Sequence, residues 1–91
     1  MEVTYRIHYH ERVVKEDILA LDATWRTKIQ HAIETKITYR PEIFGKPLRK
    51  SLRGYRKLRV GDFRVIFRIE KDTVKILVIV HRSKAYKHLA R

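Results

Sequence analysis

The chain has 91 residues, of which 44% are hydrophobic, so we expect one compact domain spanning residues 1–91. The absence of cysteine excludes disulfides and thiolate chemistry, and no apolar stretch reaches membrane-spanning length, so we expect a cytoplasmic protein. Lysine and arginine total 22 against 10 acidic residues, and this formal net charge of +12 favours nucleic acid as the partner. An anionic membrane surface or an acidic protein would satisfy the same charge.

The first half of the chain changes from a strand pattern to a helical one. Apolar and polar residues alternate over residues 3–10, which predicts a half-buried strand. From Glu11 the apolar residues fall at helical spacing, which predicts a short helix. Asp22 is suited to cap a second helix, which should end before Pro41. The apolar stripe of this second helix is Trp25, Ile29, Ala32, Ile33 and Ile37.

The second half of the chain begins with a basic loop and continues as strands. Residues 40–54 read as the loop, and the tail reads as a turn or short helix. Three strands are predicted at residues 55–60, 63–69 and 73–81, joined by tight turns at Gly61-Asp62 and Lys71-Asp72. We therefore predict an α+β fold of order βααβββ, with two N-terminal helices packed on one face of a mostly antiparallel four-stranded sheet and a short basic C-terminal tail.

The hairpin around Gly61-Asp62 concentrates basic residues on one face of the predicted sheet. A two-residue turn places Arg59 directly opposite Arg64, although like charges in that position weaken a sheet. The core face would carry Leu58, Val60, Phe63, Val65, Phe67, Ile69, Val74, Ile76, Val78 and Val80. The opposite face would carry Tyr55, Lys57, Arg59, Arg64, Arg68 and Lys75, with Ile66, Leu77 and Ile79 between them.

This basic face has no nearby acid to compensate it in the predicted register. Such an arrangement indicates a polyanion, because arginine binds phosphate bidentately and bases stack on aromatic rings such as Tyr55 and Tyr86. The alternative is an ordinary solvated sheet face. His8 and His10 lie two apart on one strand face without a third ligand, so we expect exposed residues there and no metal site.

The stretch GKPLRKSLRGYRKLRVGDFRVIFRI, followed by VIVHRSKAYK, resembles the RelE/ParE superfamily of bacterial toxins from type II toxin–antitoxin pairs. The resemblance spans nearly the whole chain and implies a toxin fold, a cognate antitoxin and cytoplasmic action. In the RelE branch the implied activity is cleavage of mRNA in the ribosomal A site. In the ParE branch the implied target is DNA gyrase.

The RelE branch is favoured because its basic cluster and its tail tyrosine have counterparts in this chain. The resemblance implies the catalytic positions Lys57, Arg59, Arg64, Arg82 and Tyr86, with His81 as a further candidate. The RNA- or ribosome-binding positions would be Arg49, Lys50, Arg53, Arg56, Arg68, Lys84 and Lys87. The chain lacks an obvious Glu in the loop ahead of the second strand, so the general base is not assigned.

The implied reaction needs neither metal nor cofactor, because the RNA 2′-OH attacks the adjacent phosphate and expels the 5′ oxygen. Arg64 suits stabilisation of the phosphorane charge, Arg82 suits the leaving group, and Lys57 is a candidate base. The expected partners are mRNA, ribosomal RNA and an antitoxin with an acidic or amphipathic segment, through which operator DNA would be bound; no membrane partner is expected. The alternatives are a ParE-like gyrase inhibitor without nuclease activity and an inactive relative that acts in operon autoregulation.

Overall fold

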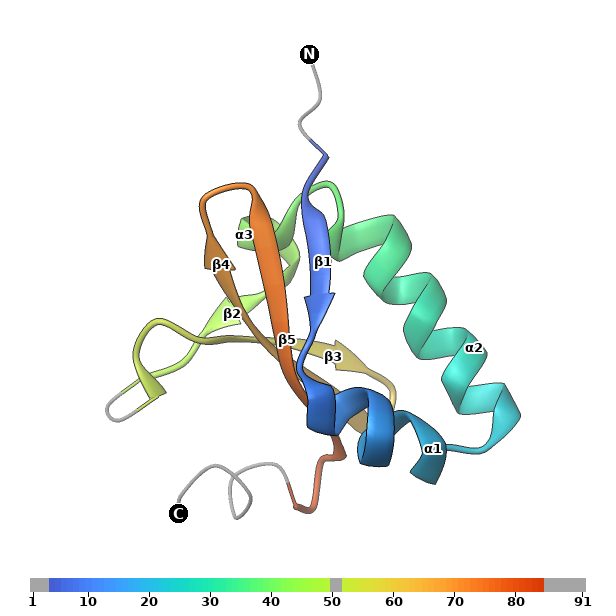
Figure 1. Cartoon of the computed structure of the whole chain (residues 1–91). Helices are drawn as coiled ribbons and strands as arrows, with labels where there is room; N and C mark the ends of the chain where they lie inside the picture. The colour runs from blue at the N-terminus through green and yellow to red at the C-terminus, as the bar shows by residue number, and fades with distance from the viewer. Residues whose placement is uncertain (1–3, 50–51, 85–91) are drawn as a thin grey trace.

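The protein is a five-stranded mixed sheet with helices packed against it (Figure 1), and the computed structural model describes residues 4–49 and 52–84. The strands are β1 (Arg6–Tyr9), β2 (Lys46–Pro47), β3 (Arg56–Val60), β4 (Phe63–Glu70) and β5 (Thr73–His81). Their order in the sheet is β1-β5-β4-β3-β2. Strand β1 pairs with β5 in parallel, and the other neighbours are antiparallel.

Two helical segments follow β1, as the sequence predicts. The first combines a π-helical stretch, η1 (Val13–Asp17), with α1 (Ile18–Ala20), and the second combines α2 (Ala23–Ala32) with a π-helical stretch, η2 (Ile33–Ile37). Asp22 caps α2, because its Oδ1 accepts a hydrogen bond of 2.9 Å from the amide of Trp25. Among the described residues, no helix is long and apolar enough to cross a membrane.

The predicted basic loop contains two short elements, so the four-stranded prediction was wrong in this region. Helix α3 (Pro41–Phe44) starts with proline, which suits the first turn of a helix because it lacks an amide donor. The two residues of β2 then pair with β3, Lys46 opposite Lys57 and Pro47 opposite Arg56. A two-residue strand has no alternating pattern, and for that reason it is not visible in the sequence.

The core lies between the helices and one face of the sheet. Its buried residues are Val13, Leu21, Ile29, Ala32, Ile33, Ile37, Leu58, Val65, Phe67, Val74, Ile76 and Ile79. Four of the five residues in the predicted α2 stripe belong to this set, and Trp25 packs against it while remaining half-buried. The helical spacing therefore identified the buried face of the second helical segment correctly.

A β-bulge in β5 changes which of its side chains face the core. The register shifts after Ile66 of β4, so Leu77 is one residue more than a regular ladder would hold. Beyond this point Ile79 joins the core, whereas Val78 and Val80 pair with residues of the opposite face. The predicted alternation was wrong here, because a continuous apolar run does not reveal a bulge.

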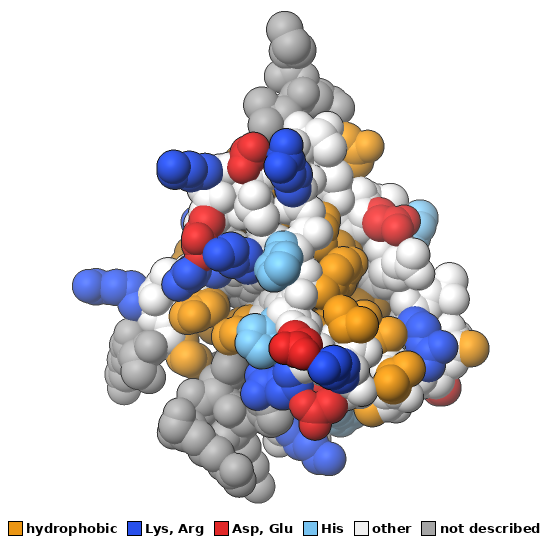
Figure 2. Space-filling model, in the orientation of Figure 1, with side chains coloured by type: hydrophobic (Ala, Val, Ile, Leu, Met, Phe, Trp, Pro, Cys, Tyr) orange, Lys and Arg blue, Asp and Glu red, His pale blue; other side chains and the backbone are white. Residues whose placement is uncertain are grey.

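Tyr9 lies in an apolar groove between the sheet and the helices. The groove has a volume of about 260 Å³ and is lined by β1, α1, α2, η2 and β5. In Figure 2, hydrophobic side chains line the region between β1 and α2. Burial of the phenol, and secondarily the charge of Glu34, raise the pKa of Tyr9 above its ordinary value of 10.0.

We expect Tyr9 to ionise above pH 10 in the folded protein, because burial disfavours the phenolate. The higher pKa belongs to the folded state, so the contribution of Tyr9 to stability is complete below pH 10 and is lost as the pH rises through the folded-state pKa. Ultraviolet difference titration of the wild type against Tyr9→Phe measures this ionisation. A Tyr9 that ionises at or below pH 10 would contradict the burial argument.

Candidate functional site

The β3–β4 hairpin has the register that the sequence predicts. Gly61 and Asp62 form a two-residue turn, and Arg59 lies opposite Arg64. We call the sheet face opposite the core the open face. Alternate residues of β3 and β4 place Lys57, Arg59, Arg64, Ile66, Arg68 and Glu70 on it, and Tyr55 comes directly before β3.

A groove of about 290 Å³ brings three of the predicted catalytic residues together. This groove, called the basic groove below, is lined by Lys36, Phe44, Lys46, Lys57, Leu58, Arg59 and Arg64. The cationic side chains come from η2, β2, β3 and β4, so four separate elements direct positive charge to one place. Such a concentration of cations is suited to a phosphate-bearing ligand.

Lys36 and Phe44 are members of the basic groove that sequence reasoning missed. Lys36 Nζ lies 5.6 Å from the centre of the Phe44 ring, and Phe44 as a residue is 41% exposed. Both residues precede the hairpin in the chain and join it because η2 and α3 pack beside β3. Nothing in their local pattern signals this placement.

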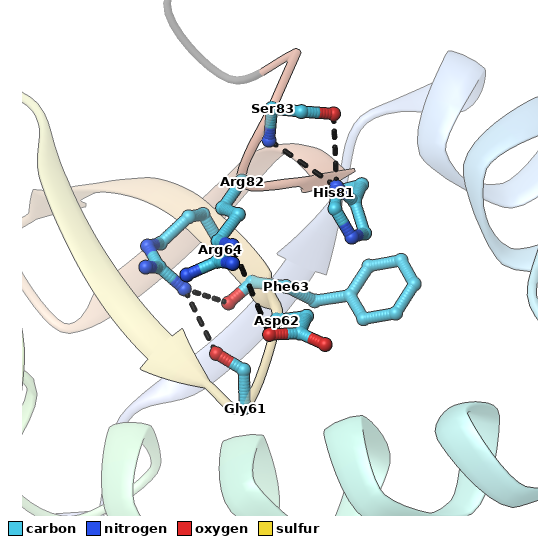
Figure 3. Close-up of polar contacts among 7 residues, drawn as sticks. All are labelled: Gly61, Asp62, Phe63, Arg64, His81, Arg82 and Ser83. Atoms are coloured by element: carbon cyan, nitrogen blue, oxygen red, sulfur yellow. Dashed lines mark hydrogen bonds and ion pairs between the residues drawn. The ribbon is translucent and has the colours of Figure 1, made fainter.

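Arg64 is held at the hairpin turn by two hydrogen bonds (Figure 3). Its Nη1 donates to the carbonyl oxygens of Gly61 at 3.0 Å and of Phe63 at 2.9 Å. The turn itself packs on α2: Gly61 has a φ of +57°, and a Cβ there would lie 2.4 Å from the Trp25 ring. The Arg64 guanidinium is therefore anchored to a turn that packs on α2 through Trp25.

Arg82 reaches the same turn from the end of β5. Its amide donates to the Asp62 carbonyl oxygen at 2.8 Å, and its Nε lies 3.8 Å from Asp62 Oδ1. Figure 3 shows the guanidinium groups of Arg64 and Arg82 on one side of the hairpin. The structure thus brings two of the predicted catalytic arginines together at one turn.

His81 lies on the other side of the hairpin. Its ring packs edge-on against Phe63 with 5.5 Å between the ring centres, and its Nδ1 accepts a hydrogen bond of 3.2 Å from the Ser83 amide. Figure 3 shows the His81 and Phe63 rings pointing away from the arginine side. The structure therefore separates His81 from the basic groove.

The Arg56 guanidinium is hydrogen-bonded to the backbone of the preceding segment. Its Nη1 donates to the carbonyl oxygens of Gly45 at 2.9 Å and of Glu42 at 3.3 Å, which holds α3 and β2 against β3. Of the remaining predicted RNA-binding residues, Arg49, Arg53 and Lys84 are exposed outside the sheet. The predicted residues Lys50, Tyr86 and Lys87 lie outside the described residues.

The prediction that no acid compensates the open face was wrong. Glu70 forms an ion pair with Arg68, and its Oε1 lies 3.2 Å from Lys75 Nζ. The hydrogen bond from Arg68, followed by that from Lys75, lowers the pKa of Glu70, and the same carboxylate raises the pKa of Arg68. Glu70 was missed because the predicted strand stopped at Ile69, whereas β4 continues to Glu70.

The mixed sheet, the helices packed on one of its faces and the basic groove define a small α+β protein suited to an anionic ligand. The family model described as the ParE toxin of the type II toxin–antitoxin system parDE matches residues 7–86. Because this match covers most of the chain, the protein belongs to that family and is a toxin of the RelE/ParE superfamily.

Two similar proteins from Mycobacterium tuberculosis carry RelE names. Toxin RelE of Mycobacterium tuberculosis is 41% identical over 49 residues, which are 52% of this chain and 50% of that protein. In this match the chain therefore spans about half the length of the curated relative. The toxin–antitoxin complex RelBE2 of the same organism contains a chain that is 28% identical, with a TM-score of 0.82 and coverage of 89% and 94% of the two chains.

Two more distant structures share the fold. In the RelB–RelE complex of Methanococcus jannaschii the matched chain has a TM-score of 0.68 at 19% identity, covering 89% of this chain and 96% of that one. YafQ of Escherichia coli has a TM-score of 0.62 at 19% identity, covering 90% and 98%. These likenesses confirm the predicted α+β class.

Proposed function

We propose that this toxin is a ribosome-dependent endoribonuclease that cleaves mRNA in the A site through attack of the 2′-OH. The observation that carries the proposal is the convergence of Lys57, Arg59 and Arg64 in the basic groove. The 41% identity to a toxin named RelE supports the same branch. The resemblance of the hairpin sequence to RelE-type toxins supplies the reaction type.

The roles of the side chains follow from where charge develops on the phosphate. Arg64, oriented by the turn carbonyls, stabilises the negative charge of the phosphorane, because its remaining N–H groups form a planar fork. Arg82, beside Asp62, stabilises the leaving 5′ oxygen. Lys57 in the groove is the candidate base, and Tyr86 remains proposed from the resemblance. Orientation of the RNA by the ribosome supplies part of the rate.

A cognate antitoxin is the proposed protein partner. Similar chains are described in complexes with antitoxins in Mycobacterium tuberculosis and Methanococcus jannaschii. With a net charge of +12, this toxin favours an antitoxin segment that is acidic or amphipathic and that folds on contact. Any operator DNA would be bound through that antitoxin.

Inhibition of DNA gyrase is the second candidate function. The observation that favours it is the family model, which describes ParE toxins. In that function the basic groove would serve binding alone and cleavage would be absent. An inactive relative acting in autoregulation would likewise leave the message intact, but without breaks in DNA.

Primer extension on a translated message tests the proposal. The purified toxin is added to a reconstituted translation system, and cleavage is mapped with and without ribosomes, with the Arg64→Ala protein as the inactive control. We expect ribosome-dependent cuts within the A-site codon. An intact message together with accumulating gyrase–DNA breaks would overturn the proposal in favour of gyrase inhibition.

A further inference from the structure

The open face holds a second hollow at the β1 side of the sheet. It has a volume of about 250 Å³ and is lined by His8, His10, Tyr55, Arg68, Lys75, Ile76 and Leu77. We call it the open-face pocket. Figure 2 shows basic, acidic and histidine side chains gathered over β1, β4 and β5 in this region.

The pocket is built from one row of side chains that crosses the sheet. His8 of β1 lies beside Lys75 of β5, and Lys75 lies opposite Arg68 of β4. Arg56 pairs with Phe67, so the next position along the hairpin brings Tyr55 beside Arg68. The Arg68 guanidinium carbon lies 5.6 Å from the centre of the Tyr55 ring, within cation–π range.

The positive charge of this row is partly neutralised by one carboxylate. Arg68 and Lys75 share the single carboxylate of Glu70, so two cations face one anion. Glu70 holds both cations in place while leaving one excess positive charge at the pocket. His10 Nδ1 accepts a hydrogen bond of 3.0 Å from the Arg12 amide, which orients the ring at the pocket.

The pocket and the basic groove lie on the same strands. Arg64 and Arg68 are four residues apart on β4, which is about 13 Å along the strand. Both side chains belong to the open face, and Ile66 lies between them on that face. A single strand of RNA that extends along β4 from the basic groove therefore reaches the open-face pocket.

We propose that the open-face pocket is an RNA subsite that binds one phosphodiester between Arg68 and Lys75 and stacks the adjoining base on the flat surface formed by Arg68 and Tyr55. This inference rests on the proposed nuclease function and names the second place where its RNA is held. Cations with an adjacent aromatic ring are typical of single-strand binding sites. An acidic peptide would bind the same cations, but its carboxylates would not stack on the Tyr55 ring. RNA has bases that stack there, so RNA fits the pocket better.

Binding of a short 2′-O-methyl oligoribonucleotide tests the subsite, because this RNA lacks the attacking hydroxyl and cannot be cleaved. Fluorescence anisotropy at several salt concentrations gives the affinity and its salt dependence. Lys75→Ala should weaken binding roughly tenfold through loss of a charge-assisted contact. It should also reduce the slope of log affinity against log salt by about 0.7, the value for one phosphate on a single strand.

Tyr55→Leu should give a different signature. It should weaken binding roughly tenfold, within the range for loss of one base–aromatic stack, while leaving the salt slope unchanged. Lys28→Ala is the matched control, because Lys28 is an exposed lysine on α2, where its Nζ lies 4.9 Å from the Trp25 ring centre. This control should retain the wild-type affinity and slope. Thermal unfolding of each variant separates loss of binding from loss of fold.

A measurement on the wild-type protein tests the location of the subsite directly. Addition of the oligoribonucleotide should shift the backbone amide resonances of His8, Arg68 and Lys75 in a nitrogen–proton correlation spectrum. Wild-type affinity and slope in Lys75→Ala would overturn the subsite. A polyglutamate peptide provides the other contradicting outcome. If the peptide shifts the same amides and loses affinity for the Lys75→Ala protein, while RNA binding to that variant persists, the pocket is assigned to an acidic protein.

The two proposals fail separately. A wild-type toxin that cleaves the translated message, but whose pocket variants bind the oligoribonucleotide normally, overturns the subsite alone. The wild-type toxin could instead leave the message intact but bind the oligoribonucleotide through Lys75 and Tyr55. That result would overturn the proposed nuclease activity, and the RNA subsite would stand.

Discussion

Arg64→Ala should lower the rate of single-turnover mRNA cleavage on programmed ribosomes by about 10²–10³, the effect of losing one preorganised donor to a developing oxyanion. The guanidinium is oriented by its bonds to the carbonyl oxygens of Gly61 and Phe63. Arg64→Lys should recover part of the rate, because a point charge replaces a planar fork. Affinity for the ribosome should change little, since many other cations remain.

The controls for Arg64 separate chemistry from folding. Lys28→Ala, an exposed charge change on α2, should cleave at the wild-type rate. Arg64→Ala should lower the free energy of unfolding by about 1 kcal/mol, because the turn carbonyls lose a donor. A folded Arg64→Ala protein that cleaves at the normal rate would remove Arg64 from the site.

Phe67→Ala should lower the free energy of unfolding by about 3–5 kcal/mol, which is a large part of the stability of a small domain. Phe67 is fully buried, with 0% of its surface exposed, and it lies at the centre of β4. Urea denaturation measures the loss. Phe67→Leu, which retains most of the apolar volume, should lose much less.

Gly45 provides a second test of the same packing. A Cβ at Gly45 would lie 2.2 Å from Cζ of Phe67, so Gly45→Ala alone should destabilise by about 1–3 kcal/mol through overpacking. In the double variant with Phe67→Ala the clash with the ring is absent, although the close contact of 2.9 Å with the Pro41 carbonyl oxygen remains. The double variant should therefore be more stable than the sum of the two single effects predicts, and strict additivity would contradict this packing.

Patterns within single segments were sufficient for much of the fold. The alternation on both sides of Gly61-Asp62 fixed the hairpin register, including Arg59 opposite Arg64, because a two-residue turn leaves one register that buries the apolar face. The helical spacing after Asp22 identified Ile29 and Ile33 as buried. These features depend on neighbours in the sequence, so the sequence contains them.

Part of the candidate site was predictable in the same way. Lys57, Arg59 and Arg64 belong to one hairpin, and their shared face follows from strand alternation. The side of the sheet on which His81 lies depends on the bulge at Leu77, which the apolar run does not reveal. His81 therefore packs on Phe63, away from the groove.

Contacts between distant segments were decided by the tertiary structure. Lys36 and Phe44 enter the basic groove because η2 and α3 pack beside β3. The open-face pocket forms because β1 pairs with β5, which brings His8 beside Lys75. No local pattern specifies which edge of a sheet a strand joins, since that choice depends on how all the apolar faces are buried together.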